Sequence, residues 1–323
     1  MLKYNSVHVS ISASSPLKVL KKSGHIVILH FFIFSMQLLD GKKVSREIYQ
    51  QLEGRVAALN QKNIHLKLAI ILVGNDPASL SYIKQKQQAS EQIGVIAELI
   101  RLKPDDVTTE SLIELIHKLN ADVSVHGILV QLPLPSHVYL PLILRAIDPK
   151  KDVDGFTAYN LGKMFLSTEF EDLAPCTPLG VIRLLEYYHV PLQGKEVVMV
   201  GASNIVGKPM AIMFLNRGST VTICHKFTVD LPSHTQKADI LVVAVGKEKL
   251  ITKEMVKKNA VVVDIGFNRT TEGKMVGDVD FNEVAPMTSY ITPVPGGCGP
   301  MTVACLMENM IKAAVKQNPL FSS

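Results

Sequence analysis

The sequence predicts an α/β protein of two domains, each built on a parallel sheet covered by helices. Strand-like and helix-like segments alternate from Met36 onward, which is the pattern of parallel strands joined by helical crossovers. The chain has 323 residues, of which 47% are hydrophobic, enough for one large or two medium cores. A stretch rich in turn residues between Asp154 and Pro178 separates two series of strands, and we place the domain boundary there.

The first 35 residues differ from the rest of the chain. They hold four lysines and no acid, and so contribute most of the formal net charge of +5. The apolar run HIVILHFFIF follows these lysines as in a signal peptide, but it is too short to span a bilayer and no small-x-small cleavage site follows it. We expect residues 1–35 to be a leader that reflects a misassigned start codon or disordered chain. The alternative is a targeting or anchoring segment.

The first domain is expected to cover residues 36–155. Runs of buried-strand character lie at residues 67–74, 95–102 and 125–135. Helical patterns at residues 79–93 and 109–120 lie between them, as a parallel sheet requires.

The second domain is expected to cover residues 175–297. Thr177, before Pro178, is predicted to cap its first helix. A last helix, residues 300–317, is expected to pack back on the first domain and complete it. The strands of the second domain are expected in five runs rich in β-branched residues, at 196–201, 220–225, 239–246, 260–268 and 289–295.

The segment VGASNIVGKPM, residues 200–210, has the position of a dinucleotide-binding turn, after a strand and before a helix. The standard fingerprint has three glycines, and the middle one lets the backbone approach the pyrophosphate. Here Gly201 and Gly207 frame the loop and the middle glycine is missing. Ser203 can still offer its hydroxyl and backbone N–H to a phosphate at the helix N-terminus. A plain strand-turn-helix junction without a ligand is the alternative.

The end of the second strand bears on which cofactor would bind. A site for NAD usually offers an acid about 20 residues after the glycine turn, to bind the ribose hydroxyls. This chain reads TICHKFT there, with His225 and Lys226 and no acid before Asp230. A cation without a carboxylate suits a 2′-phosphate, so the sequence favours NADP. The alternative for Lys226 is a solvated surface lysine.

The first domain carries polar residues in positions suited to chemistry. Tyr82 and Lys86 lie one turn apart on one face of a helix. Gln131 stands at the carboxyl end of a buried strand, where parallel sheets build their sites, and Asp154 stands in a turn near the domain junction. Each also has a purely structural interpretation. Tyr82 would be a half-buried core residue and Lys86 a solvated lysine, while Gln131 would form hydrogen bonds at the strand end and Asp154 would form a turn.

Six motifs together point to one family. They occur in the order VGNDPASLSYIKQKQQA, GILVQLPLP, KDVDGF, PCTPLG, VGASNIVGKPM and ITPVPGGCGPMT. From residue 36 to about residue 316 the chain resembles the bacterial bifunctional methylenetetrahydrofolate dehydrogenase/cyclohydrolases. The resemblance implies a folate-binding catalytic domain, a Rossmann-type domain that binds NADP, a cleft between them, and a homodimer.

The resemblance also implies roles for the residues of the first domain. Lys86 matches the lysine that assists water addition and proton movement, and Gln131 matches the residue that hydrogen-bonds this lysine. Tyr82 matches the aromatic that stacks on the aminobenzoyl ring of the folate. Asp154 matches the acid that accepts hydrogen bonds from the pterin N–H groups, a pairing that suits a carboxylate.

Further residues are implied by the same resemblance. Pro293, Gly296 and Gly297 would border the cleft and contact the substrate, or alternatively form only the turn before the last helix. Ala202 stands where some relatives carry an arginine that helps hold the 2′-phosphate. The residues implied for cofactor binding are Gly201, Ala202, Ser203, His225, Lys226 and Phe267.

Other function classes are disfavoured by composition. The four cysteines form no close pair and the ten histidines show no ligand spacing, so we expect no metal and reduced thiols in the cytoplasm. No basic stripe with interleaved aromatics indicates nucleic acid, and no membrane partner is expected. Two alternatives stay open: a catalytically silent folate or nucleotide binding protein, and an NAD-dependent dehydrogenase without efficient cyclohydrolase activity.

Overall fold

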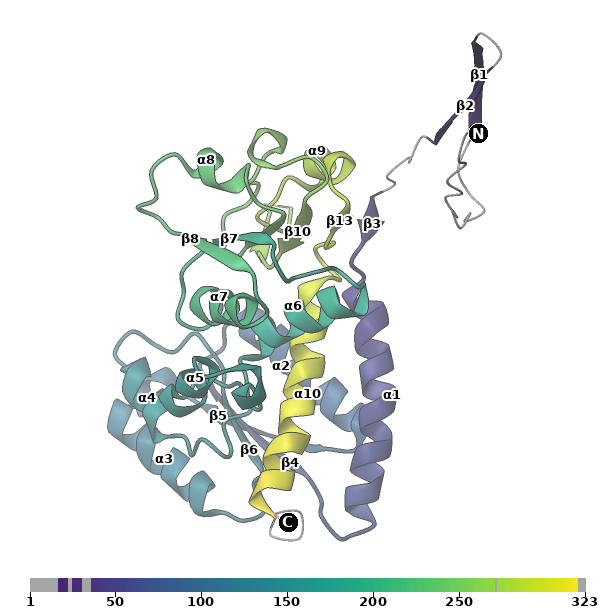
Figure 1. The fold of residues 1–323 in the computed structure, drawn as a ribbon. Coiled ribbons are helices and arrows are strands. Elements are labelled where there is room, and N and C mark those ends of the chain that lie inside the picture. Colours follow the sequence, from purple (N-terminus) through teal and green to yellow (C-terminus); the bar gives the residue numbers. More distant parts are fainter. Residues whose placement is uncertain (1–16, 23–24, 31–35, 271, 319–323) are drawn as a thin grey trace.

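The computed structural model describes residues 17–22, 25–30, 36–270 and 272–318, and it has two lobes (Figure 1). One lobe holds a three-stranded sheet in the order β5-β4-β6, and the other holds a six-stranded sheet in the order β3-β13-β10-β9-β7-β8. All neighbouring strands in these two sheets are parallel. The predicted class, two parallel sheets covered by helices, is confirmed.

The central strand of the first lobe's sheet, β4, is buried on both faces. Leu68 and Ile70 of β4 belong to a core cluster shared with the helices α1, α2 and α10, whereas Ala69 and Ile71 belong to a second cluster with α3 and α4. This alternation follows from the two-residue period of a strand. The strands are β4 (Lys67–Val73), β5 (Ile96–Leu102) and β6 (Gly127–Val130).

The third strand is shorter than the sequence pattern predicted. It ends at Val130 rather than running to Pro135, because Pro133 and Pro135 have no N–H to give to a neighbouring strand. The chain therefore leaves the sheet at Gln131.

Three helices of the first lobe, α1, α2 and α3, begin at capping side chains, whereas α4 has none. Asp40 accepts from the N–H of Lys43 at 3.1 Å, Asp76 accepts from that of Ser79 at 2.7 Å, and Thr108 forms a capping box. These caps fix where each helix starts and thus where its functional side chains stand. The helices are α1 (Gly41–Asn60), α2 (Pro77–Ile93), α3 (Thr109–Ala121), α4 (Leu140–Ala146) and a short 3₁₀ turn, Pro104–Asp106.

The sheet of the second lobe is a doubly wound one. In chain order its last five strands run 2-1-3-4-5 across the sheet, so the order reverses between β7 and β9, and β3 joins the far edge beside β13. Residues 37 and 38, at the start of the range predicted for the first domain, thus pair with the second sheet. The strands are β3 (Gln37–Leu38), β7 (Glu196–Val200), β8 (Thr220–Cys224), β9 (Ile240–Val243), β10 (Val261–Asp264) and β13 (Tyr290–Ile291).

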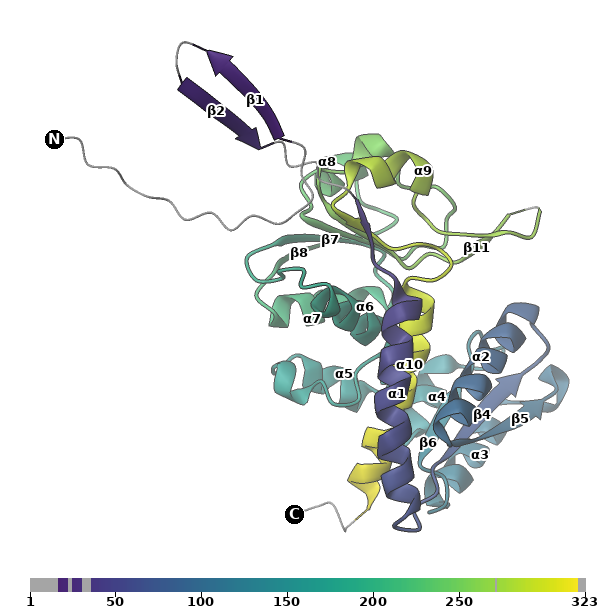
Figure 2. The same cartoon turned by 90° about the vertical axis from the view of Figure 1, so that its right-hand side faces the viewer.

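The remaining elements cover this sheet or connect the lobes. Figure 2 shows the hairpin of β11 and β12 projecting from the second lobe on the side where α2 lies. The elements are α5 (Ala158–Met164), α6 (Cys176–Tyr187), α7 (Gly207–Asn216), α8 (Leu231–Thr235), β11 (Asn268–Arg269), β12 (Met275–Val276), α9 (Phe281–Val284) and the 3₁₀ turns Thr168–Phe170, Lys253–Met255 and Ala285–Met287.

The long C-terminal helix α10 (Cys298–Gln317) packs against helices of both lobes. It lies beside α1, and it also packs against α6 and α2 (Figures 1 and 2). Leu68 of one sheet and Val242 of the other belong to the same hydrophobic cluster as Met307 of α10. One continuous core therefore holds the two lobes together and fixes the walls of the space between them.

The expected cap at Thr177 is wrong. Helix α6 begins at Cys176, so Thr177 lies inside its first turn, and its hydroxyl lies 3.1 Å from the hydroxyl of Thr302 on α10. Pro175 precedes the helix and gives no side-chain cap. The Thr177 hydroxyl, which the sequence predicted to cap α6, instead forms a contact between α6 and α10.

The expectation for residues 1–35 falls mostly outside the described residues. Within them, β1 (Leu17–Lys22) and β2 (His25–His30) pair as an antiparallel hairpin. Across the described part of the chain, no helix combines the length and apolarity needed to span a bilayer. The same part contains no group of three or more His, Cys, Asp or Glu side chains that could hold a metal ion.

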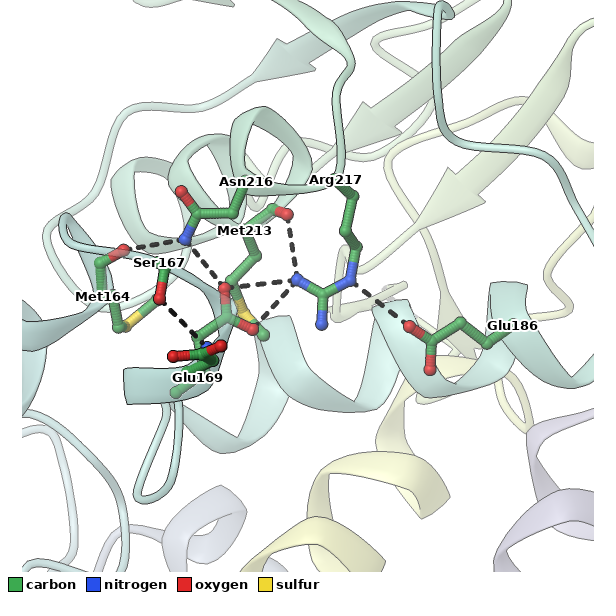
Figure 3. A network of polar contacts seen from close by, with 8 residues as sticks. Met164, Ser167, Glu169, Glu186, Met213, Asn216 and Arg217 are labelled. Carbon is green, nitrogen blue, oxygen red and sulfur yellow. Dashed lines mark hydrogen bonds and ion pairs between the residues drawn. The ribbon is translucent and has the colours of Figure 1, made fainter.

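A partly buried ion pair fastens the connection between the lobes to α7 (Figure 3). The guanidinium of Arg217 donates to both carboxylate oxygens of Glu171, at 2.9 and 3.2 Å, and also to Glu186 at 3.3 Å. Asn216 donates to the same Glu171 and to the carbonyl of Met164. Residues 164–171 are thus held against the second lobe by charge-assisted bonds.

Candidate active site

Helix α2 and strand β6 bring Lys86 and Gln131 into contact. The Lys86 Nζ donates to the Gln131 Oε1 at 3.1 Å, and both side chains are only 9% exposed. Gln131 follows β6 directly, and its own Nε2 donates to the carbonyl of Leu132 at 2.8 Å. That bond fixes the amide so that its oxygen points at the lysine. A buried ammonium or amine held by one amide oxygen can exchange protons with a neighbouring group.

This pair lines a cavity of about 380 Å³ between the lobes. Tyr82, one turn before Lys86, forms part of the same wall, as its helical spacing predicted. The second lobe contributes Thr177, Ile205 and Ile265. The remaining lining residues are Asp76, Ala78, Ser79, Leu132, Pro133, Cys298, Gly299, Thr302 and Val303. The cleft expected between two domains is therefore present.

Asp154 lies close to Lys86 rather than among the residues that line the cavity. Burial raises the pKa of the Asp154 carboxyl above its usual value, the Lys86 ammonium opposes this shift, and Asp152 adds to it. The turn is shaped by the Asp152 carboxylate, which accepts from the N–H groups of Gly155, Phe156 and Thr157. Asp152 is thus the turn former, a role that the sequence offered as the alternative for Asp154.

A larger cavity of about 810 Å³ lies at the ends of β7, β8 and β9. This is where the strand order reverses, and doubly wound sheets bind ligands at that point. Gly201 has φ +121° there, and a Cβ on it would come within 2.3 Å of the Ala244 carbonyl oxygen. A Cβ on Gly207 would come within 2.1 Å of the Gly201 oxygen. The two glycines that the turn retains are therefore both required by its backbone.

The structure explains how the turn does without its middle glycine. The Ser203 Oγ accepts from the N–H groups of Val206 and Gly207, at 3.2 and 3.3 Å, at the start of α7. Ser203 therefore stabilises the helix N-terminus, while its hydroxyl proton stays free to be donated to a ligand. The Ser203 hydroxyl lies in the cavity wall, as predicted. The N–H groups of Val206 and Gly207 at the helix start, however, already donate to Ser203.

Positive charge dominates the polar lining of this cavity. His225 and Lys226 line it, as predicted. Lys208 and Lys247 do so as well, and sequence reasoning missed both. Lys208 stands directly after Gly207 in the turn motif, which was an available signal, whereas Lys247 follows β9 in an otherwise ordinary loop. The other lining residues are Val200, Gly201, Ala202, Ser203, Phe227, Thr228, Leu231, Ala244, Val245 and Leu250, with no acid among them.

A third cavity, of about 340 Å³, adjoins the first through Tyr82. Phe267 lines it, and the ring centroids of Tyr82 and Phe267 are 5.2 Å apart, so an aromatic contact joins α2 to the loop after β10. Burial raises the pKa of the Tyr82 phenol. Lys42, Gln85 and Asp264 are further polar residues that line this cavity.

Pro293, Gly296 and Gly297 also line this third cavity. The expected reason for the glycines was close approach to a ligand, but the structure shows tight packing within the protein. A Cβ on Gly297 would come within 2.7 Å of the Thr292 Cβ, and the Gly296 carbonyl accepts from the N–H of Lys42 at 3.1 Å. The loop is thus a support between α1 and α10 as well as a cavity wall.

Comparisons with known families agree with these two cavities. Residues 39–154 match the family described as tetrahydrofolate dehydrogenase/cyclohydrolase, catalytic domain. Residues 175–318 match the family described as tetrahydrofolate dehydrogenase/cyclohydrolase, NAD(P)-binding domain.

Comparisons with individual proteins give the same family. The chain is 53% identical over 280 residues to the bifunctional protein FolD of Wolinella succinogenes, covering 86% of this chain and 97% of that protein. The crystal structure of the bifunctional dehydrogenase/cyclohydrolase FolD of Campylobacter jejuni has a TM-score of 0.85 and 50% identity, covering 88% of this chain and all of that one. A Trypanosoma brucei structure of that enzyme, complexed with NADP and an inhibitor, has a TM-score of 0.83 and 33% identity, covering 87% and 98%.

Proposed function

The chain belongs to the tetrahydrofolate dehydrogenase/cyclohydrolase family, and from this premise we infer that it catalyses two consecutive steps of one-carbon folate metabolism. It oxidises 5,10-methylenetetrahydrofolate to 5,10-methenyltetrahydrofolate with NADP⁺, and it hydrolyses that product to 10-formyltetrahydrofolate. The observation that carries this conclusion is the buried Lys86–Gln131 pair in the cavity between the lobes, next to a separate cationic cavity.

We assign the folate to the cavity between the lobes. Tyr82 offers a ring face for the aminobenzoyl group, and the Asp154 carboxylate accepts hydrogen bonds from the pterin N–H groups. Lys86 moves the proton that accompanies water addition to the one-carbon unit, while Gln131 keeps the Nζ in place. Because Tyr82, Lys86 and Gln131 line one cavity and Asp154 lies close to Lys86, a folate held there can undergo both steps without moving.

We assign NADP to the 810 Å³ cavity at the strand reversal, because the residues present fit that group. The Gly201 turn places a pyrophosphate beside Ala202 and the Ser203 hydroxyl, and the Lys226 ammonium, with His225 next to it, suits a 2′-phosphate. Some relatives carry an arginine at the position of Ala202, and this chain has none there. Lys208 and Lys247, which line the same cavity, add positive charge instead. When bound, NADP⁺ supplies the hydride acceptor. Phe267 would face the nicotinamide side, and Pro293, Gly296 and Gly297 would border the folate.

For the domains we propose residues 36–155 with helix 300–317 as the catalytic unit and residues 175–297 as the cofactor unit. The packing of α10 on α1 and α2 supports the return of the last helix to the first lobe. A cytoplasmic location is supported by the cysteines, since all four are buried, unpaired thiols whose pKa is raised by burial.

We also propose that the chain forms a homodimer through the second lobe. Strand β8 is the last strand on its side of the sheet, so its outer edge is open among the described residues, and Ile223 on it is 40% exposed. Phe165 and Leu166, which follow α5, are 70% and 69% exposed, and Leu215 on α7 is 56% exposed. The segment after α5 is held to α7 by the Arg217–Glu171 pair. Exposed apolar groups of this size indicate an interface.

The dimer is tested by placing a charge in the exposed apolar area. Leu215→Asp is expected to convert a dimer to a monomer in analytical ultracentrifugation, because a carboxylate would be desolvated at the contact. Val123→Asp, at a 90% exposed site on the first lobe, is the matched control and should leave the dimer intact. A wild-type protein that sediments as a monomer would refute the interface.

The activity is tested with purified protein and methylenetetrahydrofolate. Our assignment predicts reduction of NADP⁺ in preference to NAD⁺, with formation of 10-formyltetrahydrofolate, and hydrolysis of added methenyltetrahydrofolate without any nicotinamide. Reduction of NAD⁺ alone with accumulating methenyltetrahydrofolate would favour the NAD-dependent alternative. Binding without turnover would favour a silent binding protein.

A further inference from the structure

Two buried carboxylates lie beneath the cofactor loops and take no part in the chemistry assigned above. Asp278 is fully buried and Asp264 is 4% exposed. Burying an ionised carboxylate is costly unless its oxygens are hydrogen-bonded. In the described part of the chain the ion pairs include neither of these acids, so N–H groups must compensate their charge. Asp264 is the last residue of β10 and Asp278 follows β12, so two distant segments of the chain bring these buried acids together.

Asp278 joins two loops through a full set of hydrogen bonds. Its Oδ2 accepts from the N–H groups of Val245 and Gly246, at 2.7 and 3.0 Å. Its Oδ1 accepts from the N–H of Lys247 at 2.8 Å and from the Asn268 Nδ2 at 2.9 Å. Three successive backbone N–H groups aimed at one anion fix the loop after β9, and the Asn268 bond ties the loop after β10 to the same carboxylate.

Asp264 holds Asp278 in place from below. Its Oδ1 accepts from the N–H groups of Gly266 and Asp278, at 2.9 and 3.0 Å, and its Oδ2 accepts from that of Val279 at 2.9 Å. A Cβ on Gly266 would lie 2.3 Å from the Asp278 Cγ, and one on Gly277 would lie 1.9 Å from the Asp264 Oδ2. The glycines at these positions are therefore explained by the close approach of the backbone to the two carboxylates.

The two loops that Asp278 joins belong to different cavities. Val245 and Lys247 line the 810 Å³ cavity assigned to NADP. Phe267, next to Asn268, lines the 340 Å³ cavity and contacts Tyr82 of the folate side, at 5.2 Å between ring centroids. One carboxylate thus sets the position of a cofactor wall relative to an aromatic contact with the substrate helix.

We propose that Asp278 is a positioning residue of the dehydrogenase step: it holds the loop Val245–Lys247 and the Phe267–Asn268 loop in one arrangement, so that the cofactor and the folate meet at the right distance. This inference rests on the proposed function. We expect a smaller effect on the cyclohydrolase step, because the Lys86–Gln131 hydrogen bond joins α2 to the residue after β6 and involves neither loop, although Phe267 contacts Tyr82 of α2.

Asp278→Asn tests the proposal. The asparagine side chain has the size and shape of aspartate, but its NH₂ group replaces one of the two accepting oxygens. The N–H groups that face this NH₂ group lose their acceptor. We expect kcat/KM for NADP⁺ in the dehydrogenase assay to fall about 10- to 100-fold, since small misplacements at a reacting centre carry penalties of that size. Cyclohydrolase activity, measured with methenyltetrahydrofolate and no nicotinamide, should change less than about threefold. Equal losses of both activities, or no loss of dehydrogenase activity, would overturn the proposal.

Two further variants keep the test decisive. Asp280→Asn lies two residues along the same segment, where the carboxylate is 18% exposed and pairs with Lys249, and it should leave both activities within about twofold.

If Asp278→Asn does not fold, Asn268→Ala removes a single donor, and it should still lower dehydrogenase kcat/KM several-fold while sparing the cyclohydrolase. An Asn268→Ala enzyme with unchanged dehydrogenase activity would refute the link between the loops. Wild-type protein that lacks dehydrogenase activity would instead refute the proposed function.

Discussion

The two main cavities are built in different ways. In the cavity between the lobes the chemistry stands on buried side chains of regular elements, with Lys86 in the middle of α2 and Gln131 at the end of β6. In the cofactor cavity the shape comes from backbone at Gly201 and Gly207, and the charge comes from several exposed or half-exposed cations. A function that depends on one buried side chain is lost with it, whereas a function shared among several cations is weakened in steps. The comparison thus predicts how each cavity responds to substitution.

The largest effect is expected at Lys86. Lys86→Met removes the only assigned proton carrier, and general acid–base catalysis contributes about 100- to 10,000-fold, so cyclohydrolase kcat should fall by roughly 1,000-fold. Lys84→Met, on the same helix but exposed, is the matched control and should keep full activity. An unchanged cyclohydrolase rate in Lys86→Met would show that the chemistry lies elsewhere.

A smaller effect is expected at the backbone of the cofactor turn. Gly201→Ala forces a Cβ toward the Ala244 oxygen at a φ of +121°, so we expect the free energy of unfolding to drop by about 2 to 4 kcal/mol and dehydrogenase kcat/KM to fall about 100-fold. Urea unfolding and the two activity assays measure this. Gly162→Ala, in α5 with no atom within 4 Å of the new Cβ, should cost nothing. If both variants behave alike, the shape argument fails.

A modest effect is expected for one cation of the cofactor cavity. Lys226→Ala should raise KM for NADP⁺ about three- to tenfold and leave KM for NAD⁺ unchanged, because an exposed charge pair contributes only about 1 kcal/mol. Lys237→Ala is the control, since Lys237 is exposed and does not line the cavity. An equal rise for both nicotinamides would mean that Lys226 does not contact the 2′-phosphate.

The smallest effect is a shift in pH dependence. The Lys86 ammonium lowers the pKa of Asp154 against the effect of burial, so Lys86→Met should raise that pKa further. If the ionised Asp154 accepts the pterin hydrogen bonds, folate binding must weaken as pH falls through this pKa, and in the variant it should weaken at a higher pH. Calorimetric titration with a folate at several pH values measures the midpoint. A midpoint that stays in place or moves down would argue against coupling of the two groups.

Much of the fold follows from local patterns in the sequence. The β-branched runs become strands, and the spacing of Tyr82 and Lys86 places both on one wall. The strand that ends early at Val130 could have been shortened by counting Pro133 and Pro135, since prolines cannot extend a ladder. Thr177 is not a cap because α6 begins one residue earlier, at Cys176, and its hydroxyl instead contacts that of Thr302, far along the chain.

The rest depends on contacts between distant segments, which no local pattern contains. Strand β3 pairs with β13 at the other end of the chain, and Lys247 reaches the cofactor cavity only through the loop after β9. Asp264 and Asp278 look like ordinary polar residues beside a strand and a turn in the sequence. Their role emerges only when the fold places the donors from residues 245–247, 266 and 268 around them.

The central claim is that a folate lies between the Lys86 amine and a nicotinamide bound in the cationic cavity. A crystal structure with NADP⁺ and an unreactive folate analogue tests it most directly. The account predicts the bridging carbon position beside the Lys86 Nζ on one side and the nicotinamide on the other, with the aminobenzoyl ring on Tyr82. A folate bound outside this cavity, or an Nζ far from the bridging carbon, would contradict it.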